Sequence, residues 1–148
     1  MEVMVRPVAL DDRAVWDRLY AGYAAFYRVD QTAAMRDTVW HWLMDDGHGT
    51  EGLVACAADG SVIGLAHFRA FARPLSARTG GFLDDLFVDP DLRGKGAAEA
   101  LIAGLRDIGQ ARGWSVIRWI TAADNARARS IYDRVAVETP WVTYDIKL

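Results

Sequence analysis

The residues best suited to chemistry are Arg93-Gly94-Lys95-Gly96, between an apparent strand and an apparent helix in "LFVDPDLRGKGAAEALIAGL". A helix amino terminus carries unpaired N–H groups and the positive end of the helix dipole. Glycines before it let the backbone curl so that those N–H groups converge, which suits a phosphate. A tight turn with solvated charges needs the same residues, so local chemistry alone leaves both interpretations open.

Two familiar phosphate-binding patterns are excluded in this stretch. A P-loop requires G-x-x-x-x-G-K-[ST], which does not occur here. The dinucleotide fingerprint requires a third glycine, where this chain has Glu99. A nucleotide-binding regulatory domain is therefore disfavoured, although a different anionic ligand is not.

Two adjacent carboxylates, Asp84 and Asp85, interrupt the apolar run "GFLDDLFV". Burying an unpaired carboxylate is costly, so each needs either a partner such as an arginine or a role in a site. Adjacent residues on a strand point to opposite faces of the sheet. We therefore expect only one of the two carboxylates to face a cleft.

The pattern of apolar residues predicts the elements that position these groups. Periodicity changes along the chain and gives the order strand, two helices, three strands, helix, strand, helix, strand. Asp59-Gly60 is typical of a hairpin turn, and "FARPLSARTGG" is expected to be a polar loop. The predicted bounds include strands at Val3–Val8, Gly81–Val88 and Trp141–Leu148, and helices at Thr32–Met44 and Gly96–Arg112. The apolar run "SVIRWIT" predicts a further strand.

Composition limits the class of protein. The chain has 148 residues, 52% hydrophobic and 25% charged, which fits one globular domain spanning 1–148. A net charge of -3 argues against nucleic-acid binding, and no apolar run reaches the roughly 18 residues of a membrane span. The single cysteine, Cys56, is expected to be a buried thiol, and the histidines lack metal-ligand spacing. We expect a cytoplasmic protein without a metal.

The segments on both sides of the glycine-rich turn resemble one known family. The pattern R-x-x-G-x-[G/A], met by Arg93, Gly96 and Ala98, is similar to the acyl-CoA signature of the GNAT superfamily of N-acetyltransferases. "LDDLFVDPDLRGKG" resembles its polyamine and diamine subgroup, and "ITAADNARARSIYDRV" resembles its next motif. The similarity runs from about Ala9 to the end and implies an α/β domain, with helices flanking a mixed central sheet that is splayed at the acyl-CoA site.

The resemblance implies acetyl-CoA as the co-substrate. Its pyrophosphate would rest on the loop that comprises Arg93, Gly94, Lys95, Gly96, Ala97 and Ala98. Its pantetheine arm would pair with the strand backbone of Leu86, Phe87 and Val88. Asn125 would bond the pantetheine or simply cap a helix, and Arg127 and Arg129 would reach the nucleotide phosphates or remain solvated.

The resemblance also implies the roles of the catalytic residues. Tyr132 would protonate the departing thiolate, although its type and position also fit an ordinary core aromatic residue. Asp84 or Asp85 would take the amine proton. Asp84 is slightly favoured, because its position usually holds glutamate; the shorter aspartate favours a water relay. His67 is a third candidate for the base.

A small cationic amine (a polyamine, diamine or amino acid) is the expected acceptor. A protein lysine, an aminoglycoside, or a non-catalytic acyl-CoA-binding module are the alternatives. The acceptor pocket is expected near a set of aromatic residues, Tyr20, Tyr23, Phe26, Tyr27, Trp40 and Trp42. The carboxyl end resembles a yeast subgroup in which subunits pair, which implies a homodimer joined through a last strand at Trp141–Leu148.

Overall fold

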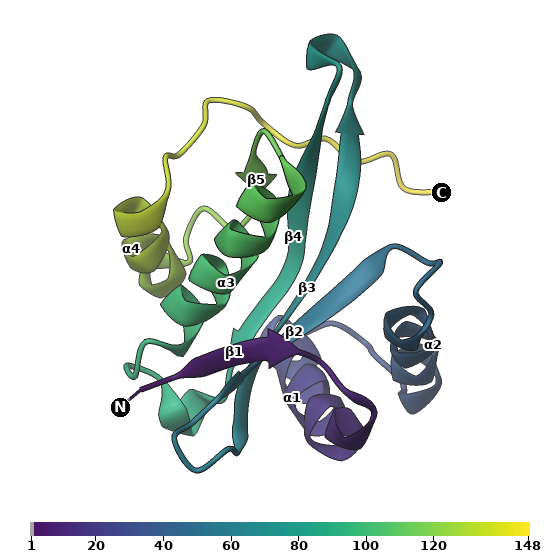
Figure 1. Ribbon diagram of the computed structural model, residues 1–148, viewed down its shortest axis with the longest axis vertical. Coiled ribbons are helices and arrows are strands. Elements are labelled where there is room, and N and C mark those ends of the chain that lie inside the picture. Colours follow the sequence, from purple (N-terminus) through teal and green to yellow (C-terminus); the bar gives the residue numbers. More distant parts are fainter. Residues whose placement is uncertain (1) are drawn as a thin grey trace.

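Five strands form one sheet in the computed structural model, which describes residues 2–148 (Figure 1). The sheet order follows the chain from β1 to β5; pairing is antiparallel from β1 to β4, and β5 runs parallel to β4. The mixed α/β arrangement predicted from the sequence is confirmed. The strands and helices are β1 (Met4–Pro7), α1 (Arg13–Phe26), α2 (Ala33–Met44), β2 (Thr50–Cys56), β3 (Val62–Arg73), β4 (Arg78–Val88), α3 (Ala97–Arg112), β5 (Ile117–Arg118) and α4 (Ala126–Val135).

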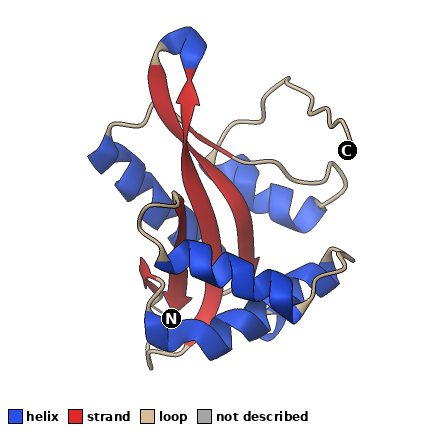
Figure 2. Ribbon diagram, turned by 90° about the vertical axis from the view of Figure 1, so that its right-hand side faces the viewer, coloured by secondary structure: helices blue, strands red, loops and turns tan. Residues whose placement is uncertain are grey.

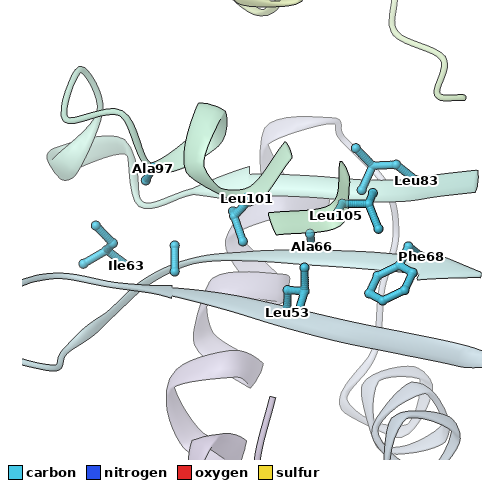
Figure 3. Close-up of a cluster of buried hydrophobic side chains, with 9 residues drawn as sticks. Leu53, Ile63, Ala66, Phe68, Leu83, Ala97, Leu101 and Leu105 are labelled. Carbon is cyan, nitrogen blue, oxygen red and sulfur yellow. The ribbon is translucent and has the colours of Figure 1, made fainter. Parts of the chain in front are cut away.

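Helices cover both faces of this sheet (Figure 2). On one face, α3 places Ala97, Leu101 and Leu105 over the central strands, as Figure 3 shows. On the other face, α1 and α2 place Trp16, Leu19 and Trp40 over the same strands. Long strands buried on both faces explain why "LVACAADGSVIGLAHF" is almost continuously apolar.

The helix boundaries agree with their capping signals. The hydroxyl of Thr32 accepts a hydrogen bond from the N–H of Met35, which satisfies one unpaired donor at the start of α2. Gly113 ends α3 with a φ of +73°, a left-handed conformation that glycine adopts without strain. The predicted turn at Asp59-Gly60 is also confirmed, and it joins β2 to β3.

The β3–β4 hairpin extends further than predicted. Strand pairing continues to Arg73 and Arg78, so "FARPLSARTGG" is mainly strand and only its tip, around Pro74–Ser76, is a turn. The glycines that suggested a loop are required by close packing. A Cβ built on Gly81 would lie 2.2 Å from the ring of Trp114, so only glycine fits there.

The predicted last strand at Trp141–Leu148 is wrong. Residues 136–148 form neither helix nor strand, and Figure 1 shows them as an extended yellow trace leaving α4. A strand needs a neighbour for its backbone hydrogen bonds. Here β5, the edge strand after α3, is reduced to Ile117–Arg118, whereas "SVIRWIT" had predicted a longer strand.

No helix within residues 2–148 combines the length and the apolar character needed to cross a bilayer.

Candidate active site

The edge of β4 opens where β5 leaves it. Pairing between the two strands is confined to Gly81 with Ile117 and Phe82 with Arg118, so the rest of β4 has no strand neighbour on that side. The opening therefore begins before Leu86, and the splayed sheet expected from the sequence is present. A cavity of about 410 Å³ lies at this edge, walled by β4, the start of α3 and α4.

This first cavity brings together most of the residues singled out from the sequence. Its lining includes the predicted residues Leu86, Phe87, Val88, Arg93, Gly94, Gly96, Ala97, Ala98, Asn125 and Tyr132. Lys95 is the exception, because its exposed side chain lies outside the lining. Sequence analysis placed Phe26 and Tyr27 with the acceptor, yet both line this cavity.

The loop before α3 presents unpaired backbone donors to the cavity. Gly94 and Gly96 have φ values of +82° and +81°, so the chain curls twice in the left-handed region. Among the described residues, no N–H from Gly94 to Ala98 has an acceptor; the first paired N–H is that of Ala100, which bonds the carbonyl of Gly96. Such a cluster of donors at a helix amino terminus has the chemistry to bind an anion.

Arginine side chains add positive charge around this loop. Arg93, Arg127 and Arg134 all line the cavity, and the guanidinium of Arg93 lies 5.2 Å from the ring centre of Phe26. Arg129 does not line it, since its guanidinium bonds the carbonyl of Ala123 and the carboxylate of Glu138. Of Arg127 and Arg129, only Arg127 therefore lines the cavity.

Tyr132 lies on α4 at the wall of the first cavity. Its ring packs edge-to-face on Trp119, with 5.3 Å between ring centres. Burial, and to a smaller extent the neighbouring Tyr27, raise the pKa of Tyr132 to about 12, so the phenol keeps its proton at neutral pH. The side chain is thus a packed aromatic residue whose protonated phenol belongs to the cavity wall.

Asn125 is the helix cap at the start of α4. Its Oδ1 accepts a hydrogen bond from the N–H of Ala128 at 3.3 Å, and its Nδ2 donates to the hydroxyl of Tyr27 at 3.3 Å. The capping role considered from the sequence is confirmed. The same two bonds fix the position of Asn125 in the cavity wall.

A second cavity, of about 270 Å³, lies over the same strand. Its lining consists of Tyr20, Val39, Trp42, Thr50, His67, Arg69, Asp84 and Asp85. Asp85 and Leu86 are consecutive, so β4 passes from the second cavity directly into the first. Along α1, a row of aromatic contacts from Trp16 through Tyr20 and Tyr23 to Tyr27 also joins the two cavities.

A β-bulge places both carboxylates in this second cavity, which corrects the expectation that only one would face a cleft. Phe68 pairs with Leu83 and His67 pairs with Asp85, so Asp84 is an extra residue in β4. A bulge sets two residues opposite one and interrupts the alternation of faces. The prediction assumed that successive side chains of β4 point to opposite faces, and the bulge at Asp84 breaks that alternation.

Asp85 is held in a buried hydrogen-bond network. Its Oδ2 accepts from the hydroxyl of Tyr20 at 2.9 Å and contacts Nδ1 of His67 at 2.8 Å. Burial alone would raise the pKa of Asp85, but the hydrogen bonds from His67 and Tyr20 outweigh it and hold that pKa below its ordinary value. The hydroxyl of Tyr23 contributes in the same direction, and Asp85 is therefore ionised at neutral pH.

His67 is a satisfied core histidine. It is 2% exposed, and the indole N–H of Trp16 lies 2.9 Å from its Nε2. An indole only donates, so Nε2 must accept and the ring proton must be on Nδ1, where it is donated to Asp85. Both nitrogens are occupied, and the ring orients Asp85 instead of offering a free base.

Asp84 has a different environment at the rim of the second cavity. Its side chain is exposed and forms an ion pair with Arg69, in which Nε and Oδ2 are 3.1 Å apart. Sequence analysis did not single out Arg69 or Thr50. The alternation of faces along β3 gave a signal for Arg69, because it lies two residues beyond His67 and so shares its face.

Within residues 2–148, no group of three or more histidine, cysteine, aspartate or glutamate side chains could hold a metal ion.

Known acetyltransferases resemble this chain in sequence. Residues 16–136 match the family described as acetyltransferase (GNAT) family. The D-amino-acid N-acetyltransferase HPA3 of Saccharomyces cerevisiae is 24% identical over 143 residues, which cover 96% of this chain and 89% of that protein.

Solved structures of acetyltransferases have the same fold. The ribosomal-protein-alanine N-acetyltransferase from Brucella melitensis biovar Abortus 2308 is 28% identical, with a TM-score of 0.82 and both chains fully covered. An aminoglycoside N-acetyltransferase in complex with CoA is 19% identical and has a TM-score of 0.83, with 99% of this chain and 95% of that chain covered.

Proposed function

Because the chain belongs to the acetyltransferase (GNAT) family, we propose that it moves the acetyl group of acetyl-CoA to a primary amine by direct attack in a ternary complex. One observation carries this proposal. A cavity with unpaired N–H groups and Tyr132 adjoins a cavity with an ionised carboxylate, and the consecutive residues Asp85 and Leu86 join them. Two substrates bound in these cavities would meet at β4.

In this proposal, the first cavity holds acetyl-CoA. The N–H groups from Gly94 to Ala98 bind the pyrophosphate, with Arg93 and Arg127 adding charge. The open edge of β4 at Leu86, Phe87 and Val88 pairs with the amides of the pantetheine arm, as an added strand would. The position of Lys95 outside the lining supports the backbone as the main contact.

Three proton movements accompany the proposed transfer. The neutral amine nitrogen bonds to the thioester carbonyl carbon, the carbon–sulfur bond breaks, and the thiolate receives the phenolic proton of Tyr132. The nitrogen then releases its second proton, which returns through water to the Tyr132 phenolate and leaves a neutral amide. Asp85 attracts the ammonium form of the acceptor, and water beside Asp85 carries away the proton that the amine loses before attack. The geometry favours Asp85 over Asp84 for this role, since Arg69 already neutralises Asp84.

A small primary amine is the proposed acceptor. The relatives named above act on D-amino acids, on alanine of a ribosomal protein and on aminoglycosides, so names alone do not decide among these classes. The volume of the second cavity, about 270 Å³, favours a small molecule over a folded protein segment.

Calorimetric titration and thiol release test this function. We expect heat on titration with acetyl-CoA but none with ATP or NAD, and release of free thiol when a panel of amines is added. Absence of heat with acetyl-CoA would overturn the proposal. Binding without thiol release across the panel would favour a non-catalytic acyl-CoA-binding module.

Replacing Tyr132 with phenylalanine should lower kcat about tenfold and leave the Kd of acetyl-CoA nearly unchanged. The effect is moderate because a thiol has a pKa of about 8.5 and leaves as a thiolate without full protonation. Since the pKa of Tyr132 is about 12, the wild-type enzyme should lose no activity from its ionisation between about pH 7 and 10. Stopped-flow assays of thiol release measure both effects, and Thr79→Val, which removes an exposed hydroxyl outside both cavities, is the control. Equal kcat values for the two variants would contradict the role of Tyr132.

A homodimer is the proposed assembly, supported by the carboxyl-terminal segment. This segment exposes six apolar side chains, each at least 75% accessible: Val137, Trp141, Val142, Tyr144, Ile146 and Leu148. Exposed apolar side chains in such number are typical of a surface that another chain covers.

Removal of residues 137–148 should convert the proposed dimer into a monomer. The apolar side chains that would bury surface between two chains are then absent. Light scattering coupled to size-exclusion chromatography gives the mass. Thr143→Glu keeps all six apolar side chains of the segment and is the control, so its mass should stay that of the dimer. A full-length chain with the mass of a monomer would exclude this assembly.

A further inference from the structure

Arg69 is the cation in the lining of the second cavity. It lies on β3, two residues after His67, and therefore on the same face of the sheet as the network around Asp85. Thr50 on β2 is its partner on one side and Phe82 on β4 is its partner on the other. A positive charge is unexpected in a site that only has to attract an ammonium group.

The guanidinium of Arg69 is oriented by two contacts. Its Nε donates to Oδ2 of Asp84 at 3.1 Å, and its Cζ lies 4.8 Å from the ring centre of Phe82. The described residues accept no hydrogen bond from its two terminal nitrogens. An arginine fixed at Nε, with both terminal nitrogens free, presents the fork that binds a carboxylate through two parallel bonds.

The charges of the cavity are arranged for a zwitterion. Arg69 balances Asp84, so Asp85 supplies the remaining negative charge of the lining. An acceptor with a second ammonium group would bring it close to Arg69, where like charges repel. An acceptor with a carboxylate near its amine would instead meet an opposite charge at each end.

The spacing of these two charges suits a short molecule. His67, the strand partner of Asp85, and Arg69 are two residues apart on β3, so their Cα atoms lie about 7 Å apart. Because both side chains line the same cavity, a ligand that bonds Asp85 at one end and Arg69 at the other is a short one. An α-amino acid carries its ammonium and carboxylate on one carbon and meets this limit.

We propose that Arg69 binds the carboxylate of an amino-acid acceptor whose amino group lies at Asp85. This inference rests on the proposed function. It makes Arg69 the residue that gives the enzyme its preference for amino acids over amines without a carboxylate.

Matched acceptors with and without a carboxylate test the inference. Alanine and ethylamine, phenylalanine and phenethylamine, and lysine and cadaverine differ only by that group, and each amino acid is supplied in both enantiomers. We expect the wild-type enzyme to prefer an amino acid in at least one pair. Arg69→Gln should lower kcat/KM for that amino acid by about tenfold or more and change kcat/KM for its matched amine by less than about threefold.

Two further variants keep the test independent of folding. Arg69→Lys retains the charge without the fork and should fall between the wild type and Arg69→Gln. Arg78→Gln, on the same hairpin and outside the cavity, should behave as the wild type. Wild-type preference for the simple amine in every pair, or an equal loss for both members in Arg69→Gln, would overturn the carboxylate site alone. Absence of thiol release with all acceptors would instead overturn the proposed function, and the inference with it.

Discussion

Replacing Asp85 with asparagine should lower kcat/KM for the acceptor by about a hundredfold to ten-thousandfold, the range associated with loss of a group that assists proton transfer. Asparagine has the same shape and can still bond His67 and Tyr20, so the network remains but its charge does not. The neutral amide attracts no ammonium and accepts no proton through water. Steady-state kinetics with saturating acetyl-CoA measure the loss.

Asp84→Asn is the matched control for this variant. Asp84 is exposed and paired with Arg69, and an amide oxygen can still accept from Nε of Arg69, so we expect a loss below about tenfold. A larger loss in Asp84→Asn than in Asp85→Asn would reverse the assignment of the two carboxylates. An unchanged Kd for acetyl-CoA in both variants would show that the effect is confined to the acceptor side.

The pH dependence of stability gives a second measure of Asp85. Its pKa in the folded chain lies below the ordinary value of 3.8, so its ionised form stabilises the fold. That contribution is complete above about pH 4 and is lost as the pH falls through the lowered pKa. Thermal melting of Asp85→Asn should therefore depend less on pH than the wild type does below about pH 4.

Gly96→Val should raise the Kd of acetyl-CoA about a hundredfold. A β-branched residue at a φ of +81° is strained, and relief of that strain would rotate the N–H groups away from their common centre. No protein atom lies within 4 Å of a Cβ built on Gly96, so the added side chain meets no clash in the free chain. Since Gly96 lines the first cavity, calorimetry with acetyl-CoA should register the change.

Lys95→Ala is the neighbouring control, and we expect its Kd to change by less than about threefold because an exposed ammonium contributes little. Melting temperatures of both variants separate a loss of binding from a loss of folding. Equal losses of affinity, or a larger loss in Lys95→Ala, would assign the anion site to side-chain charge instead of the backbone.

The sequence predicted most of the first cavity because its residues are local. The loop from Arg93 to Ala98 directly precedes α3, and the strand residues Leu86 to Val88 directly precede that loop. Glycine spacing and a helix start therefore predict a tight turn at a helix amino terminus without knowledge of distant contacts. The choice of an anion site over a solvated turn, and the role of the strand residues, required the family resemblance. Asn125 and Tyr132 required it too, since α4 meets the cavity only through the tertiary fold.

The second cavity was harder to predict because it depends on pairing between strands. Simple alternation gave one carboxylate on each face, but the register between His67 and Asp85 inserts a bulge that no short pattern in "GFLDDLFV" reveals. The predicted last strand failed for a related reason. The segment at Trp141–Leu148 alternates as a strand should, yet alternation does not supply the neighbour that a strand requires.

The bulge at Asp84 also has a genetic consequence. Leu83 and Leu86 pack toward α3, whereas Asp85 and Phe87 face α1, so loss of the codon for Asp84 would leave every other side chain of β4 on its present face. It would, however, restore a regular ladder and reduce the local twist just beyond the last pair between β4 and β5. Loss of this one codon would therefore remove one carboxylate from the second cavity and alter the twist of β4 beside its open edge. A lineage with that deletion would change both cavities in one step.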